Sequence, residues 1–204
     1  MNHTSPGKTE TFDVVVVGGG PAGATAADDL ARQGRKVLLL DRAGRIKPCG
    51  GAIPPRLMRD FAIPESQLAA RAHSARMVSP ADVKVDIPIE GGYVGMVDRE
   101  HFDEWLRERA ASHGAQRRSG RFERLERDAD GTAVIHFRST DGNDREGPPA
   151  SVRARAVIGA DGARSQVAQQ TIPGAERMAC VFAYHRSSRC PIKHRPAMTR
   201  PAAT

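Results

Sequence analysis

Cysteine is scarce in this sequence, and its scarcity narrows the chemistry that the chain can use. Only Cys49, Cys180 and Cys190 occur among 204 residues, and no two of them form a Cys-x-x-Cys pair. An odd count without clustering argues against a disulfide framework and against a cysteine-based metal site. We therefore predict a reduced, cytoplasmic setting, no bound metal and no redox-active disulfide at Cys49.

Long hydrophobic runs are also lacking. No stretch approaches the roughly 20 apolar residues that cross a bilayer, and the N-terminal segment MNHTSPGKTETF has no apolar core typical of a secretory signal. Hydrophobic residues make up 39% of the chain and charged residues 27%, which is typical of a soluble globular protein. We expect a single domain with a sizeable core over residues 1–185.

Acidic residues are missing from one end of the chain. The formal net charge is +7, and residues 186–204 contain four Arg, one Lys and no acid, which leaves +2 for the rest. A nearly neutral body lacks the basic stripe that follows a phosphate backbone, so we predict no nucleic-acid partner. Residues 186–204 also show no apolar period. We interpret them as a disordered or out-of-frame tail, and a genuine C-terminal tail is the alternative.

What the chain does contain begins with a βαβ pattern. Residues 13–17, DVVVV, form a β-branched run typical of a strand buried in a parallel sheet. The turn GGGPAG follows at 18–23, then a small-residue helix that ends at Gly34, then the strand KVLLL at 36–40. These elements span about 30 residues, as in the minimal unit of a Rossmann-like α/β fold.

The rest of the chain predicts β-rich segments at 75–97 and 115–150, separated by a helix at 99–114. A Pro- and Gly-rich loop at 42–64, with a short helix from Pro54, precedes them. In chain order we further expect a hairpin at 75–89, a strand at 92–97, a ribbon at 121–139 that turns at Asp130-Gly131, an exposed loop at 141–150, a strand entering a glycine turn at 152–165 and a strand start at 178–185.

Glycines with GxGxxG spacing, between a strand and a helix, predict a dinucleotide site. Gly18 permits a tight turn, Gly20 lets the backbone approach a pyrophosphate, and Gly23 lets helix and strand pack. The start of the helix, at Pro21 and Ala22, offers N–H groups and a partial positive charge to the phosphates. A turn of this kind that binds no phosphate is the alternative.

An acid after the second strand and a later glycine turn favour FAD. Asp41 can accept hydrogen bonds from a ribose diol and would repel a 2′-phosphate, which excludes NADP from this site. The next β-α unit is replaced by a long loop and a hairpin. The strand that ends in GADG at 159–162 brings Asp161 and Gly162 to the same sheet edge, as the second contact that an extended FAD needs.

Longer motifs resemble the geranylgeranyl reductase family. They are DVVVVGGGPAGATAADDLA, KPCGGAIPP, VDIPIE, GMVDREHFDEWLRERA and VIGADGARS. The resemblance runs from about Phe12 to His185 and is closest to members that act on bacteriochlorophyll. It implies the FAD-binding fold of the glutathione-reductase-like superfamily with an inserted β-rich segment, and it covers the N-terminal part only, so the C-terminal substrate domain is missing.

The resemblance also implies a reaction. Family members saturate C=C bonds of a geranylgeranyl chain, with FAD bound and NADPH as reductant, in chlorophyll and bacteriochlorophyll biosynthesis. The expected partner is a prenylated tetrapyrrole or an isoprenoid diphosphate, with peripheral contact at the photosynthetic membrane. Two alternatives stay open. A class A flavin monooxygenase shares GxGxxG and the Asp-Gly turn, although KPCGG argues against it, and residues 186–204 favour an inactive FAD-binding fragment.

Matching residues extend the resemblance to the cofactor site. Cys49, Gly50 and Gly51 correspond to a loop beside the flavin ring, where a thiol could position or deliver the proton that alkene reduction requires. A small buried hydrophobe is the alternative for Cys49. Arg42 and Arg99 are also expected at the cofactor, with Arg99 bonded to pyrophosphate or ribityl oxygens; a surface arginine is the alternative. His101 and His113 are interpreted as surface residues.

Overall fold

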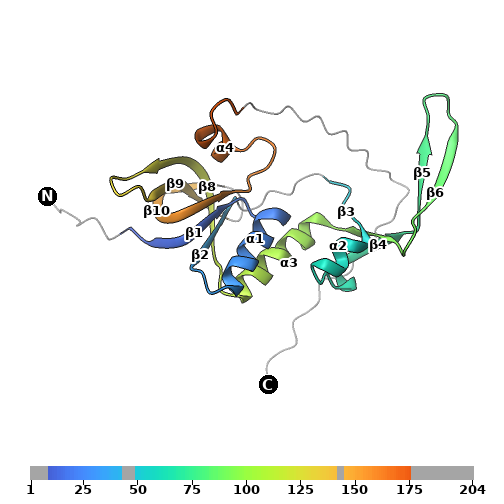
Figure 1. Cartoon of the computed structure of the whole chain (residues 1–204), viewed down its shortest axis with the longest axis horizontal. Coiled ribbons are helices and arrows are strands. Elements are labelled where there is room, and N and C mark those ends of the chain that lie inside the picture. The colour runs from blue at the N-terminus through green and yellow to red at the C-terminus, as the bar shows by residue number, and fades with distance from the viewer. Residues whose placement is uncertain (1–8, 43–48, 142–144, 176–204) are drawn as a thin grey trace, which may run out of the picture. The chain divides into compact units, whose positions relative to one another are not determined.

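The computed structural model describes residues 9–42, 49–141 and 145–175 (Figure 1). These residues form two compact units, one made of residues 9–42, 98–141 and 145–175 and the other of residues 49–97. The strand start predicted at 178–185 and the tail at 186–204 lie outside the described residues, as does part of the 42–64 loop.

The first unit contains the predicted βαβ start, the helix and the ribbon. Its elements are β1 (Thr11–Val17), α1 (Pro21–Arg32), β2 (Val37–Asp41), α3 (Arg99–Ser112), β8 (Gln116–Arg127), β9 (Ala133–Thr140), β10 (Glu146–Gly159) and α4 (Gln166–Thr171). Left-handed glycines follow both long helices, at Gly34 (φ 77°) and Gly114 (φ 108°), as the sequence predicted. Gly131, with φ 82°, lies at the predicted turn of the ribbon.

Two long strands, β8 and β10, connect this unit because each pairs with different neighbours along its two parts. Residues 116–119 of β8 pair in parallel with β2, and residues 120–127 pair antiparallel with β9. The first part of β10 pairs antiparallel with β9, and its last part, residues 153–159, pairs in parallel with β1. The result is a closed ring in the order β1-β10-β9-β8-β2, in which β8-β2-β1-β10 is a parallel Rossmann-like sheet.

The main core lies between the parallel sheet and the antiparallel ribbon. Its largest side chains come from both layers and are almost fully buried; they include Phe12, Leu38, Leu40, Ile135 and Phe137. Val167 of α4 joins the same cluster. Because alternate residues of β1 and β2 point to opposite sides of the sheet, the other side is left for the helices.

Small residues let α1 and α3 lie side by side (Figure 1). Ala24 and Ala27 of α1 are fully buried. Asp28 is only 2% exposed, and its carboxylate faces Nε of Arg109 at 3.3 Å and Nδ1 of His113 at 2.5 Å. His113 is exposed, as predicted, and its ring also contacts the buried carboxylate of Asp28 between the helices.

The exposed loop predicted at 141–150 is wrong in part, because β10 already begins at Glu146. Two prolines in this stretch concealed the strand. The register with β9 shifts between Glu146 and Pro149, and this part of β10 pairs on one side only. A residue without an N–H group is tolerated at such an irregular edge.

The second unit is small and mostly strand. Its elements are β3 (Ala52–Ile53), α2 (Pro55–Asp60), a 3-10 turn (Glu65–Gln67), β4 (Leu68–Ala72), β5 (Ser74–Val78), β6 (Lys84–Pro88) and β7 (Val94–Val97). The short helix near Pro54 and the 75–89 hairpin were predicted, whereas β4 was not. Strands β3, β7 and β4 form one sheet and β5-β6 another. Among the described helices, none combines the length and hydrophobicity that a bilayer span requires.

Candidate functional site

The turn between β1 and α1 is closed by direct backbone packing. Gly18 has φ 106°, and a Cβ there would lie 2.4 Å from the carbonyl oxygen of Ala160. A Cβ on Gly23 would lie 1.8 Å from the carbonyl oxygen of Gly18. Neither Gly18 nor Gly23 can be replaced by a residue with a side chain unless the backbone moves. Two of the three glycines of GxGxxG are therefore required by the fold itself.

Gly20 differs from Gly18 and Gly23 because, apart from its chain neighbours, no atom of the described residues lies within 4 Å of the place where its Cβ would be. It forms the N-cap of α1, with extended backbone at φ −71° and ψ −179°, and Pro21 begins the helix. No side chain caps this helix end, and its first turn contains no acid. The open space, the helix N-terminus and the missing acid together fit a pyrophosphate.

Asp41 lies directly under the same turn. A Cβ on Gly19 would lie 2.6 Å from Oδ2 of Asp41, so the second glycine of GGG allows this carboxylate to approach the backbone. Nη1 of Arg107, on α3, donates to the carbonyl oxygen of Gly19 over 3.0 Å and lies 3.4 Å from Oδ2 of Asp41. Sequence reasoning selected Asp41 and missed both Gly19 and Arg107.

A second acid holds Arg107 in this position. Nε of Arg107 donates to Oε2 of Glu104 over 2.9 Å, and Arg117 donates to Oε1 of Glu104 over 2.7 Å. Burial acts to raise the pKa of Glu104, but hydrogen bonds from Arg117 and Arg107 outweigh burial and lower that pKa below its usual value. Arg107 is thus hydrogen-bonded to ionised Glu104 as well as to Asp41. The carboxylate oxygens of Asp41 can therefore still accept hydrogen bonds from a ligand.

The second glycine turn packs against the first. The N–H of Ala160 donates to the carbonyl oxygen of Val17 over 2.8 Å, and Gly162 has φ 87°. Asp161 accepts from the hydroxyl of Ser165 at 2.5 Å and from the N–H groups of Gln166 and Val167 at 2.6 and 3.3 Å. The structure thus brings GADG to the Gly18 turn, as expected, and uses most of the Asp161 carboxylate to cap α4.

Arg99 is held by its own helix. Its guanidinium donates to both oxygens of Asp103 over 2.7 Å each, and only 14% of the Arg99 side chain is exposed. The alternative of a surface arginine is therefore wrong. Contact of Arg99 with a cofactor stays a prediction, as it does for Arg42, which follows β2 directly and is half-buried.

The cysteine loop belongs to the second unit. Cys49 is exposed, so the alternative of a buried hydrophobe is wrong. The N–H of Gly51 donates to Sγ of Cys49 over 3.5 Å. Gly51 has φ 69°, and a Cβ there would lie 2.0 Å from the carbonyl oxygen of Val97, whereas a Cβ on Gly50 would meet no other described residue within 4 Å, its chain neighbours aside. Close packing on β7 is thus one reason for glycine at position 51.

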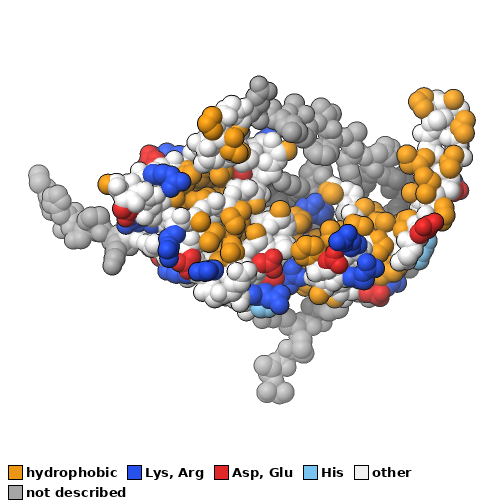
Figure 2. Space-filling model, viewed as in Figure 1, with side chains coloured by type: hydrophobic (Ala, Val, Ile, Leu, Met, Phe, Trp, Pro, Cys, Tyr) orange, Lys and Arg blue, Asp and Glu red, His pale blue; other side chains and the backbone are white. Residues whose placement is uncertain are grey.

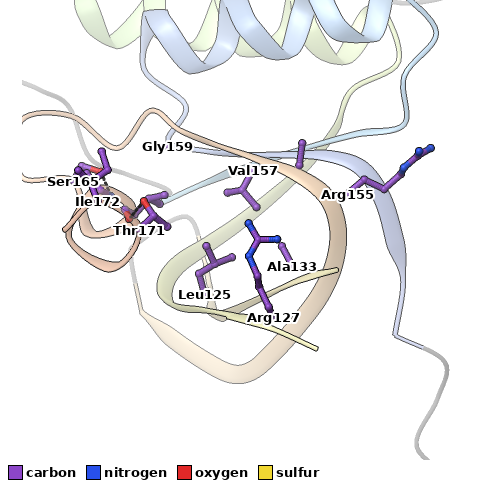
Figure 3. Close-up of a pocket in the computed structure, with 12 residues that line it drawn as sticks. Leu125, Arg127, Ala133, Arg155, Val157, Gly159, Ser165, Thr171 and Ile172 are labelled. Atoms are coloured by element: carbon purple, nitrogen blue, oxygen red, sulfur yellow. Dashed lines mark hydrogen bonds between the residues drawn. The ribbon is translucent and has the colours of Figure 1, made fainter. Parts of the chain in front are cut away.

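A cavity of about 310 Å³ opens elsewhere in the first unit, between the ribbon and α4 (Figure 3). Leu125, Val157, Val167 and Ile172 give it an apolar lining. Figure 3 shows the side chain of Arg155 pointing away from the other labelled residues. Of the residues in the two glycine motifs, only Gly159 lines this cavity, so it is separate from the turn around Gly20.

The chain is similar in sequence to FAD-binding proteins and to geranylgeranyl reductases. A family model described as FAD binding domain matches residues 11–181. Geranylgeranyl diphosphate reductase of Rhodobacter capsulatus is 57% identical over 180 residues, which cover 88% of this chain and 44% of that protein. The chloroplastic geranylgeranyl diphosphate reductase of Arabidopsis thaliana is 39% identical over 176 residues, which cover 83% of this chain and 38% of that protein.

Solved structures agree with the fold. A geranylgeranyl bacteriochlorophyll reductase-like protein from Thermoplasma acidophilum superposes with a TM-score of 0.66 at 28% identity, over 76% of this chain and 40% of that one. A p-nitrophenol 4-monooxygenase from Pseudomonas putida superposes with a TM-score of 0.64 at 22% identity, over 79% of this chain and 44% of that one, which shows the shared fold alone. The chain spans less than half the length of each of these proteins.

Proposed function

This chain belongs to the FAD binding domain family, and we propose that it forms the FAD-binding part of a geranylgeranyl reductase. Such an enzyme reduces C=C bonds of a geranylgeranyl chain with NADPH. The observation that carries the proposal is the 57% identity to the Rhodobacter capsulatus reductase over 88% of this chain. The geometry of the β1-α1 turn supports it.

Residues of the first unit would hold the cofactor. The open space at Gly20 and the uncapped start of α1 suit the pyrophosphate, because helix N–H groups and the helix dipole both favour an anion there. Asp41 would accept hydrogen bonds from the adenosine ribose. Arg42, Arg99, Asp161 and Gly162 remain further candidates. Bound FAD supplies the hydride chemistry that side chains lack.

Cys49 is the proposed source of the proton. An isolated alkene accepts hydride only if a proton reaches its other carbon, which requires a positioned acid. Cys49 holds an exposed thiol, and the N–H of Gly51 donates to its sulfur. This contact fixes the position of the sulfur within the loop. We assign the proton to Sγ of Cys49, with Gly50 and Gly51 shaping the loop.

The proposed substrate is a geranylgeranyl group attached either to a diphosphate or to a tetrapyrrole. The curated relatives include reductases named for geranylgeranyl diphosphate, and a solved relative is named as like a bacteriochlorophyll reductase. A substrate with a 20-carbon apolar tail would bring the enzyme to the photosynthetic membrane as a peripheral protein.

Joining this chain to the remaining part of the Rhodobacter capsulatus reductase tests the proposal. The hybrid is supplied with NADPH or NADH and with either geranylgeranyl diphosphate or geranylgeranyl bacteriochlorophyll, and products are weighed by mass spectrometry. We expect a product heavier by the mass of two hydrogen atoms, with NADPH preferred. A hybrid that binds FAD but hydrogenates neither substrate would overturn the proposal. A product that gains an oxygen atom would assign the chain to the monooxygenases instead.

A further inference from the structure

Arg107 connects α3 to the turn between β1 and α1. Its Nη1 donates to the carbonyl oxygen of Gly19 over 3.0 Å and to Oδ2 of Asp41 over 3.4 Å. Nε and Nη2 of the same guanidinium each lie 2.9 Å from Oε2 of Glu104. Only 19% of the Arg107 side chain is exposed, so these contacts lie largely out of solvent, where hydrogen bonds between charged groups are stronger.

The shape of the guanidinium sets the direction of these contacts. Its N–H groups lie in one plane and cannot turn independently of one another. Glu104 takes the side with Nε and Nη2, and Glu104 is itself held by Arg117 at 2.7 Å. Nη1 of Arg107 is therefore directed at the end of β2, where Asp41 lies.

Asp41 must present its carboxylate in a defined orientation to bind a ribose. The Asp41 side chain is 31% exposed, and a Cβ on Gly19 would lie 2.6 Å from its Oδ2, so this oxygen faces the turn. Each carboxylate oxygen can accept two hydrogen bonds, so Arg107 uses only part of the acceptor capacity of Asp41. A carboxylate that is already held in place loses less conformational entropy when a ligand binds.

We propose that Arg107 is a positioning residue for the adenosine ribose of FAD. It acts through Asp41, because it holds the carboxylate in the orientation that accepts a hydrogen bond from the ribose 2′-hydroxyl. Arg107 thereby makes the site select ribose over 2′-deoxyribose. The inference rests on the proposed function in taking the adenosine half of FAD as the ligand.

A pair of nucleotides that differ in one hydroxyl group tests this role. ADP and 2′-deoxy-ADP differ only at the ribose 2′ position, so the ratio of their dissociation constants, measured by calorimetry, reports the contact to that hydroxyl. We expect the 204-residue chain to bind ADP roughly tenfold more tightly, the scale of one hydrogen bond to a charged group. In Arg107→Met the ratio should fall below about threefold, through a loss of affinity for ADP.

Arg109→Met is a matched control on the same helix. The Arg107 and Arg109 side chains are 19% and 18% exposed, and Nε of Arg109 also faces a carboxylate, 3.3 Å from Oδ2 of Asp28. Figure 2 shows acidic and basic side chains close together where α1 and α3 lie side by side. Loss of Arg109 changes the packing of these helices and leaves the contacts of Asp41 in place. Arg109→Met should therefore keep the parent ratio even if its urea midpoint falls.

Arg107→Lys is a milder second variant. Lysine keeps the positive charge but lacks the planar fork that reaches Glu104, Gly19 and Asp41 together, so the ratio should fall here as well. Circular dichroism in urea establishes that each variant is folded under the conditions of the titration. The parent ratio in a folded Arg107 variant would overturn the proposal. An equal loss of affinity for both nucleotides would also overturn it, because a merely structural role of Arg107 predicts that result.

Asp41→Asn tests the underlying ribose contact separately. If Asp41→Asn loses the discrimination between the two nucleotides and Arg107→Met keeps it, the inference about Arg107 fails alone. If the parent does not discriminate, or if Asp41→Asn discriminates as well as the parent, the ribose contact assigned to Asp41 under the proposed function fails too.

Discussion

Two glycine-containing segments of this molecule, 18–23 in the first unit and 49–51 in the second, are built alike. Each pairs a glycine whose Cβ would strike a backbone carbonyl with a glycine whose Cβ would meet nothing. In the first segment, a Cβ on Gly23 would lie 1.8 Å from the carbonyl oxygen of Gly18, and Gly20 is the glycine with open space. In the second segment, a Cβ on Gly51 would lie 2.0 Å from the carbonyl oxygen of Val97, and Gly50 is the glycine with open space.

This comparison distinguishes two reasons for a glycine, close packing within the protein and space for a ligand, which a sequence motif alone does not distinguish. Gly23 and Gly51 are required by packing within the protein, whether or not a ligand binds. Among the described residues, Gly20 has open space beside a helix N-terminus, and an anion is favoured at such a place. Gly50 has the same open space but lies next to an exposed thiol rather than a helix end. Substituting each glycine in turn therefore tests which reason applies.

Gly23→Val should have the largest effect. The new side chain must displace the carbonyl of Gly18 and the end of β1, so the first unit should lose at least about 3 kcal/mol of its free energy of unfolding, the upper range for overpacking an interior. Urea denaturation followed by circular dichroism measures this loss. Gly20→Ala is the control and should unfold like the parent, and equal losses in both variants would contradict the packing argument.

Gly51→Ala should come next. Alanine at φ 69° costs about 1–2 kcal/mol, and the clash with Val97 O adds to that. We expect hydrogen exchange to accelerate across residues 49–97 while residues 9–42 keep the protection of the parent. The neighbouring substitution Gly50→Ala should change little, within roughly 0.5 kcal/mol. If both alanines accelerate exchange alike, the contact with β7 does not explain Gly51.

Gly20→Val separates cofactor binding from folding. Its side chain would occupy the space that we assign to the pyrophosphate, so FAD affinity should fall by roughly 1.4–2.8 kcal/mol, tenfold to a hundredfold. The urea midpoint should stay near that of the parent, because the new Cβ would meet no described residue within 4 Å except its chain neighbours. Calorimetry with FAD decides the matter, and unchanged affinity would remove this turn from the site.

Local sequence patterns predicted most of the first unit, because the buried hydrophobic residues of its strands and helices recur with the period of a strand or of a helix. They failed where contacts are distant or strands irregular. Arg107 reaches Asp41 and Gly19 across 66 and 88 residues, and no local signal marks it. The sequence of β4, LAARA, lacks the alternation of a strand, and its register with β7 is irregular. The prolines near Glu146 concealed the start of β10.

Asp41→Ala should weaken FAD binding by about 1–3 kcal/mol, the scale of a lost hydrogen bond to a charged group. The loss should appear equally with ADP, which carries the adenosine ribose but no flavin. Asp13→Ala is a matched control, since the Asp13 and Asp41 side chains are 35% and 31% exposed. Calorimetry on both variants separates a specific contact from a general change of charge, and an equal loss at Asp13 would argue for the latter.

Cys49→Ser should have the smallest effect on folding and on FAD affinity, because serine fits the same exposed loop and keeps a polar hydrogen. In the Rhodobacter hybrid, reduction of FAD by NADPH should proceed at the parent rate, since that step needs no proton from the alkene side. Reoxidation by the prenylated substrate should slow, because a hydroxyl is a far weaker acid than a thiol. Positioned acid catalysis is worth about 10²–10⁴-fold.

Stopped-flow flavin absorbance times the two half-reactions of the Cys49→Ser hybrid separately. The thiol is the acid only if the second half-reaction slows while the first does not. Reoxidation at the parent rate would show that Cys49 does not donate the proton. The glycine at position 51 of the KPCGG motif would then be explained by its close packing against Val97 alone. A matched slowing of both half-reactions would instead indicate that the loop positions the cofactor rather than the proton.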